Sequence, residues 1–136
     1  MKPFKQATIV GAGAMGRGIA QVAAMGGCAV NVNLYDPHES ALTSAIKQLE
    51  SVYSRLVDKG RRSRESFDDA LARITTIVNF KDAQCSDLVI EAIVESLDAK
   101  RSVFQMVDDV VSEDCVLATN TSSLSIAAIS AGVNNP

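Results

Sequence analysis

The sequence has few cysteines, no surplus of basic residues and no long apolar run, and each of these shortages excludes a class of protein. Its three cysteines, Cys28, Cys85 and Cys115, are widely separated and form no CxxC pair. They therefore predict neither a disulfide framework nor a zinc site, and we expect no metal. A formal charge of −3 argues against a general binder of nucleic acid or of anionic membranes, because both require a broad excess of positive charge.

The amino-terminal region also lacks the features of a targeting signal. Residues 1–6 are polar and basic, and the apolar run that follows is broken by glycine within a few residues. The sequence therefore predicts neither a secretory signal nor a membrane span. Unpaired cysteines fit a reducing compartment, so we expect a cytoplasmic protein.

Short β-prone runs alternate with amphipathic helical segments along the whole chain. Strands are expected at residues 7–10, 29–35, 74–78, 87–92 and 115–120, and helices at 14–25, 39–59, 67–73, 98–111 and 124–131. The alternation predicts one α/β domain, doubly wound around a parallel sheet. A polar turn at 61–66 joins two of these helices into a helical hairpin between the second and third strands.

A glycine-rich loop joins the first strand to the first helix. In the pattern Gly11-x-Gly13-x-x-Gly16, the first glycine permits a tight turn, the second lets the backbone approach a pyrophosphate, and the third brings helix and strand close together. The anion would lie on the helix N-terminus, where free N–H groups favour negative charge. Such loops also arise for packing alone, but the strand–turn–helix setting favours dinucleotide binding.

An acidic residue follows at the end of the second strand. Asp36 lies about 20 residues beyond the third glycine, where an acid accepts hydrogen bonds from the adenine ribose. A carboxylate repels a 2′-phosphate, and neither Pro37 nor His38 offers an arginine to bind one, so NAD is favoured over NADP. The alternative is that Asp36 only opens the turn with Pro37 and caps the next helix.

From about Thr8 to its C-terminus, the chain resembles the NAD-binding domain of the L-3-hydroxyacyl-CoA dehydrogenases. The resemblance is carried by the stretches IVGAGAMGRGIAQVAA, LYD, DLVIEAIVES and ATNTSSLSI. It implies a Rossmann-type fold over residues 1–136 with NAD as the cofactor. It also implies oxidation of the 3-hydroxyl of a hydroxyacyl-CoA, such as 3-hydroxybutyryl-CoA, to a ketone in fatty-acid β-oxidation or a related acyl-CoA pathway.

The resemblance further implies roles for individual residues. Ser122 would hydrogen-bond the 3-oxygen of the substrate near the nicotinamide and is the predicted catalytic residue. Without the resemblance, Glu95 and Lys100 would be interpreted as solvated charges at a helix start, and Ser122 as a helix cap. The predicted cofactor contacts are Gly11, Ala12, Gly13, Ala14, Met15, Gly16, Asp36, Glu95, Lys100, Asn120 and Ser122.

The helical hairpin has a family counterpart that reaches over CoA. A lysine near the end of its first helix would correspond to Lys59, which is the predicted CoA contact. The neighbouring Arg61, Arg62 and Arg64 either help to hold CoA phosphates or form a solvated turn.

Two features depart from the family pattern. Residues 28–36 carry two extra positions, which predicts either a partly polar strand face with Asn31, Asn33 and Tyr35 or a bulge. In addition, the catalytic histidine and glutamate of the family belong to an HFFNP-type segment that is not found here, and His38, the only histidine, follows Asp-Pro on the adenosine side. We therefore expect a domain that binds NAD with little turnover, from a parent enzyme that dimerises through a helical C-terminal domain.

The sequence leaves three other functions open. A non-catalytic NAD-binding or redox-sensing module would need no catalytic base, but it would not need the serine-rich NTSSLSI segment either. A β-hydroxyacid dehydrogenase of the phosphogluconate type shares the glycine loop followed by Met-Gly. A bare Rossmann domain that serves as an oligomerisation scaffold would bind no nucleotide.

Overall fold

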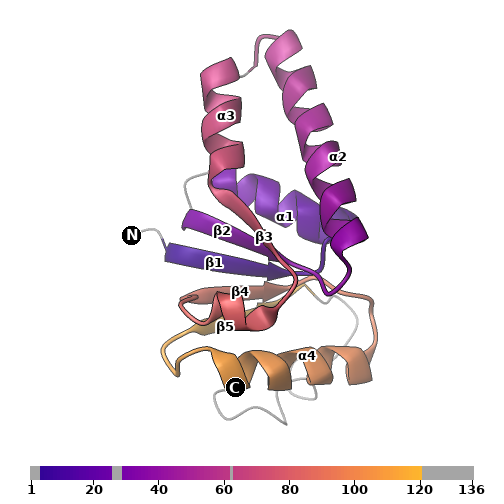
Figure 1. Ribbon diagram of the computed structural model, residues 1–136, viewed down its shortest axis with the longest axis vertical. Helices are drawn as coiled ribbons and strands as arrows, with labels where there is room; N and C mark the ends of the chain where they lie inside the picture. Colours follow the sequence, from indigo (N-terminus) through magenta and orange to yellow (C-terminus); the bar gives the residue numbers. More distant parts are fainter. Residues whose placement is uncertain (1–3, 26–28, 62, 121–136) are drawn as a thin grey trace.

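A five-stranded parallel sheet forms the centre of the computed structural model, which describes residues 4–25, 29–61 and 63–120 (Figure 1). Its strands are β1 (Phe4–Val10), β2 (Ala29–Tyr35), β3 (Ile74–Ile77), β4 (Leu88–Glu91) and β5 (Val116–Thr119). They lie in the order β3-β2-β1-β4-β5. After β3 the chain crosses to the other side of β1, so the carboxyl ends of β1 and β4 flank the switch point where open α/β sheets bind ligands.

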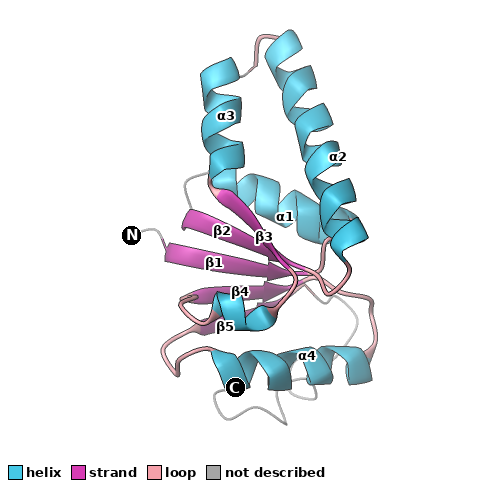
Figure 2. Ribbon diagram, in the orientation of Figure 1, coloured by secondary structure: helices cyan, strands magenta, loops and turns pink. Residues whose placement is uncertain are grey.

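Helices cover both faces of this sheet. On one face lie α1 (Ala14–Met25), α2 (Glu39–Asp58) and α3 (Arg64–Ala72), and on the other lie α4 (Leu97–Val110) and the short 3-10 helix η1 (Phe80–Ala83) (Figure 2). The helices α2 and α3 form a hairpin that extends away from the sheet (Figure 1). The predicted doubly wound α/β fold with a helical hairpin between the second and third strands is therefore confirmed.

The core is divided by the sheet into two apolar clusters. On the α1 side, the buried alanines of α1 meet Ile9, Val32 and Leu34, and these short side chains let the helix approach β1 and β2 closely. On the α4 side, Tyr35 contacts Phe80 edge-on, with the ring centroids 5.2 Å apart. Among the helices of the described ranges, none is both long and apolar enough to cross a membrane.

The partly polar face expected on β2 is present, without a bulge. β1 and β2 keep one register from Phe4 opposite Ala29 to Val10 opposite Tyr35. Asn33 is buried and donates from Nδ2 to Thr8 Oγ1 at 3.3 Å, and this oxygen lies 2.6 Å from Ser86 Oγ. Because these buried hydroxyl and amide groups bond one another, the strand accommodates polar side chains in its interior.

Two predicted boundaries need correction. The first strand, β1, begins at Phe4 rather than at Ala7. The second helix of the hairpin begins at Arg64 rather than Phe67, because Ser63 caps it by accepting a hydrogen bond from the Ser66 N–H at 3.0 Å. The polar turn expected at 61–66 is correspondingly shorter. The 3-10 helix η1 was not predicted, and the helix expected at 124–131 lies outside the described residues.

Candidate nucleotide-binding site

The glycine-rich loop leaves β1 in a conformation that requires glycine at its first position. Gly11 has a φ of +110°, and its N–H donates to the Tyr35 carbonyl at 2.8 Å. A Cβ at Gly11 would lie 2.6 Å from the Ala92 carbonyl oxygen, and L-residues rarely adopt this φ. The loop is therefore bound to the end of β2 and lies directly against the segment that follows β4.

The other two glycines of the motif serve different purposes. A Cβ at Gly16 would lie 1.7 Å from the Gly11 carbonyl oxygen, so this glycine is needed for α1 to start beside the loop. A Cβ at Gly13 would meet no atom within 4 Å. The fold therefore does not need the missing side chain of Gly13, but a diphosphate at the N-terminus of α1 would use that open space. The glycine loop and the N-terminus of α1 therefore fit the diphosphate of NAD.

Asp36 joins the second strand to the same loop. Its Oδ2 accepts from the Ala12 N–H at 3.2 Å, and its Oδ1 accepts from the His38 N–H at 2.9 Å and lies 3.1 Å from His38 Nδ1. The glycine loop and the acid thus meet at one edge of the sheet. Asp36 also opens the turn with Pro37, which was one part of the alternative interpretation of this residue. It does not cap α2, because the N-cap is His38.

A pocket of about 260 Å³ opens beside Asp36. Its walls come from the ends of β1 and β2, the segment after β4 and one side of α4, and its lining is Val10, Gly11, Tyr35, Asp36, Pro37, Ile93, Ser102, Val103 and Met106. Burial, and after it the Asp36 charge, raises the pKa of Tyr35, so its phenol stays protonated and donates to Met106 Sδ at 3.8 Å. A mostly apolar pocket with one carboxylate at its edge suits an adenosine.

A larger groove of about 570 Å³ lies elsewhere, between α2 and β3. Its lining includes Leu42, Ile46 and Thr76 but none of the predicted cofactor residues. The smaller pocket is the relevant one, because it contains Gly11 and Asp36.

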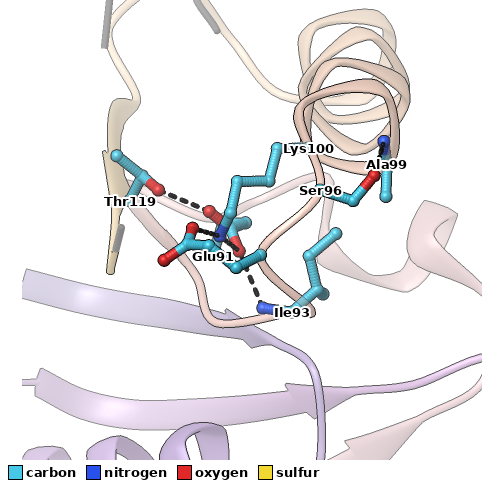
Figure 3. Close-up of polar contacts among 7 residues, drawn as sticks. Glu91, Ile93, Ser96, Ala99, Lys100 and Thr119 are labelled. Carbon is cyan, nitrogen blue, oxygen red and sulfur yellow. Dashed lines mark hydrogen bonds and ion pairs between the residues drawn. The ribbon is translucent and has the colours of Figure 1, made fainter. Parts of the chain in front are cut away.

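A buried charged cluster occupies the carboxyl end of β4 (Figure 3). Glu91 is 0% exposed, and its Oε2 accepts from the Ile93 N–H at 2.7 Å and from Lys100 Nζ at 2.6 Å. Its Oε1 accepts from the Thr119 hydroxyl. Lys100 Nζ also lies 3.4 Å from Glu95 Oε1. Lys100 thus pairs with Glu95 directly and also with Glu91, which the sequence prediction missed.

A sequence signal for Glu91 was available. It is the charged residue that ends the otherwise apolar strand segment LVIE, and a buried carboxylate needs a partner. Lys100, which was interpreted as either a cofactor contact or a solvated charge, is 1% exposed. The solvated alternative is therefore wrong for Lys100, whereas Glu95, with 40% of its side chain exposed, keeps contact with solvent.

The remaining predicted residues are distributed unevenly. Asn120 is exposed, and its N–H donates to the Glu91 carbonyl at 2.9 Å, which places it at the same edge. Ser122 lies outside the described residues. Lys59 is exposed at the far end of the 20-residue α2, a helix about 30 Å long, and is not brought to this edge. Arg64 lies over the Phe67 ring, 4.8 Å from its centroid.

A parallel sheet with a glycine loop after β1 and an acid bonded to that loop at the end of β2 defines the class of dinucleotide-binding α/β domains. A family model described as "3-hydroxyacyl-CoA dehydrogenase, NAD binding domain" matches residues 6–136. The chain belongs to this family. The predicted fold, the NAD cofactor and the family resemblance are confirmed over the alternatives left open by the sequence.

Individual relatives agree with the family assignment. A 3-hydroxybutyryl-CoA dehydrogenase of Clostridioides difficile is 35% identical over 128 residues, which cover 94% of this chain and 45% of the relative. The solved 3-hydroxybutyryl-CoA dehydrogenase of Escherichia coli K12 is 36% identical with a TM-score of 0.93, over 98% of this chain and 28% of that one. The (S)-3-hydroxybutyryl-CoA dehydrogenase of Ralstonia eutropha is 35% identical with a TM-score of 0.91, over 96% and 46%. The chain spans less than half the length of each.

Proposed function

We propose that the protein to which this domain belongs is an NAD-dependent 3-hydroxyacyl-CoA dehydrogenase. It would oxidise the 3-hydroxyl of an L-3-hydroxyacyl-CoA to a 3-oxoacyl-CoA, with transfer of hydride to NAD. The observation that carries the proposal is the hydrogen bond between Asp36 and the Ala12 N–H, which joins both halves of a dinucleotide site in a chain of this family. Acyl-CoA as the substrate class is supported by the names of the relatives.

The residues of this domain would bind and orient the cofactor. NAD, when bound, supplies the hydride acceptor. The N-terminus of α1 offers backbone N–H groups to the diphosphate across the open space at Gly13. Asp36 would accept hydrogen bonds from the adenine ribose and repel a 2′-phosphate. Since the adenosine is then held at β2, the nicotinamide half would extend toward the ends of β4 and β5, where Glu95, Lys100 and Asn120 lie.

Several further roles belong to this proposal through the family resemblance. Ser122 would hydrogen-bond the 3-oxygen of the substrate, and Lys59 would contact CoA. His38 does not suit the role of proton acceptor, because its side chain is 79% exposed and bonded to Asp36 at the adenosine end. We assign that role to a histidine of the helical C-terminal domain, which would also form the homodimer of a cytoplasmic enzyme.

Calorimetric titration with NADH and with NADPH tests the cofactor site directly. The 136-residue chain should bind NADH and bind NADPH far more weakly, and Asp36→Ala should weaken NADH binding by about tenfold. A folded chain that binds neither nucleotide would contradict the proposal. Activity would then be measured as acetoacetyl-CoA reduction by the longer enzyme, in which Ser122→Ala should lower kcat by about a hundredfold.

A further inference from the structure

The charged group buried at the end of β4 is built around Glu91, a residue that has no role in the function proposed above. This group consists of Glu91, Lys100, Thr119 and the Ile93 N–H, and we call it the Glu91 cluster (Figure 3). Burial of an ion pair is costly, and a pair of well-packed apolar residues often stabilises a fold as well or better. The cluster is therefore poorly explained by stability alone.

The Glu91 cluster connects four segments of the chain. Glu91 ends β4, Ile93 belongs to the segment after it, Lys100 lies in the first turns of α4, and Thr119 ends β5. The backbone of Glu91 adds a further tie, because its carbonyl accepts from the Asn120 N–H at 2.9 Å. One carboxylate thus fixes the segment 92–96 relative to α4 and β5.

The segment 92–96 forms one wall of the nucleotide site. The Ala92 N–H donates to the Val10 carbonyl at 2.9 Å. The Ala92 carbonyl oxygen packs against Gly11, so closely that a Cβ added to Gly11 would lie 2.6 Å from it. Ile93 lines the pocket beside Asp36. Glu95 lies 3.4 Å from the ammonium that Glu91 holds. A shift of this segment would therefore displace the support of the glycine loop, the pocket wall and Glu95 together.

We propose that Glu91 is a positioning residue for NAD binding, which holds Lys100 and the segment 92–96 in the geometry that the cofactor requires. Glu91 is 0% exposed, so it acts without touching the cofactor. The inference rests on the NAD site proposed above. It adds that NADH affinity depends on a carboxylate outside the contact surface.

The test compares NADH affinity with stability in matched variants. Glu91→Gln keeps the side-chain size but removes the charge that balances Lys100, and it should weaken NADH binding at least about tenfold. Ser86→Ala is the control, because it removes the buried hydrogen bond between the hydroxyls of Ser86 and Thr8. Thr8 lies on β1, before the glycine loop. Ser86→Ala should lower the unfolding midpoint and leave the Kd for NADH unchanged. Both Kd values are measured by calorimetry, under conditions in which circular dichroism shows that each variant is fully folded.

A double-mutant cycle shows whether Glu91 acts through Lys100. In a Lys100→Met background the Glu91→Gln change should cost less than about threefold in NADH affinity, because the group that it positions is already gone. Equal costs in both backgrounds would overturn the proposal, and so would a Glu91→Gln variant with the wild-type Kd. Wild-type chain that does not bind NADH would instead overturn the proposed function, and this inference with it.

A milder variant covers the case in which Glu91→Gln does not fold. Thr119→Val removes the hydroxyl donor to Glu91 Oε1 and leaves the Lys100 and Ile93 bonds in place. It should weaken NADH binding about threefold, whereas Ser86→Ala should not weaken it. The same Kd in Thr119→Val, Ser86→Ala and wild type would overturn the proposal.

Discussion

The two carboxylates at the nucleotide edge differ in exposure and in the partners they have. Asp36, at the end of β2, has 16% of its side chain exposed and accepts from two backbone N–H groups beside an exposed histidine ring. Glu91, at the end of β4, is fully buried and holds a buried ammonium. Asp36 can exchange its partners for ligand hydroxyls, whereas Glu91 cannot do so without leaving a buried charge uncompensated. Exposure and partner type thus separate the carboxylate that we propose to bind the ribose from the carboxylate that we propose to position the segment 92–96.

The same contrast occurs within the glycine loop. Gly16 faces the protein, because its Cβ position is occupied by the Gly11 carbonyl, whereas the Cβ position of Gly13 is open. We therefore expect a side chain added at Gly16 to damage the fold, and a side chain added at Gly13 to damage NADH binding alone.

Gly16→Ala should have the largest effect. Its Cβ would lie 1.7 Å from the Gly11 carbonyl oxygen, so α1 would have to move away from β1. We expect a loss of more than about 3 kcal/mol in the free energy of unfolding. Urea denaturation followed by circular dichroism measures this loss. A variant with the wild-type midpoint would show that the loop is not as tightly packed as described.

Gly13→Ala should leave the fold intact and weaken the Kd for NADH by about tenfold, because the new methyl group would occupy the space of the diphosphate. Gly18→Ala is the matched control, since its Cβ would also meet nothing within 4 Å but lies further along α1. It should stabilise the helix by up to about 1 kcal/mol without a change in NADH affinity. Equal Kd values for the two variants would remove the distinction between Gly13 and the rest of α1.

Asp36→Asn sharpens the comparison of the carboxylates. The amide keeps a hydrogen-bond acceptor of similar size but removes the charge that repels a 2′-phosphate. We expect NADH affinity to fall about threefold and the preference for NADH over NADPH to fall about tenfold. Parallel titrations with both nucleotides measure this. An unchanged preference would mean that discrimination resides outside Asp36.

The sequence was sufficient for the alternation of strands and α-helices, because each of these elements has a strong local pattern. The glycine loop and Asp36 also follow from spacing, since the loop ends β1 and the acid ends β2. Boundaries were less certain where a cap decides them, as at Ser63, whose side chain accepts from the Ser66 N–H. The choice between a bulge and a polar face on β2 depended on Thr8, which lies 25 residues away from its partner Asn33.

The partners of Glu91 could not be identified from the sequence, because they are remote along the chain. Lys100 lies nine residues away, on α4, and Thr119 lies 28 residues away, at the end of β5. Only the parallel pairing of β4 with β5 brings Glu91 and Thr119 opposite each other. A charged residue at the end of an apolar strand signals a buried site, but the tertiary structure identifies the residues that neutralise it.

The contrast between exposed and buried groups extends to the cysteines. Among the described residues, Cys85 is an exposed free thiol and Cys115 is a buried one. Burial, and after it the Asp87 charge, raises the pKa of Cys115 from 9.0 to about 11. At about pH 8, iodoacetamide should therefore alkylate Cys85 and leave Cys115 unmodified until the chain unfolds. Peptide mass spectrometry distinguishes the two sites, and rapid native labelling of Cys115 would contradict its burial.

The smallest expected effect is the pH dependence that Cys115 adds to stability. Because its pKa is raised in the folded state, from 9.0 to about 11, the thiol contributes stability below pH 9 that is lost as the pH rises toward 11. The loss should be on the order of 1 kcal/mol. Urea denaturation across this range should show a steeper decline in the free energy of unfolding for the wild type than for Cys115→Ala. The contributions of the lysines and of Tyr35 to this decline cancel, because both proteins contain these residues. Parallel curves would mean that the Cys115 thiol titrates alike in both states.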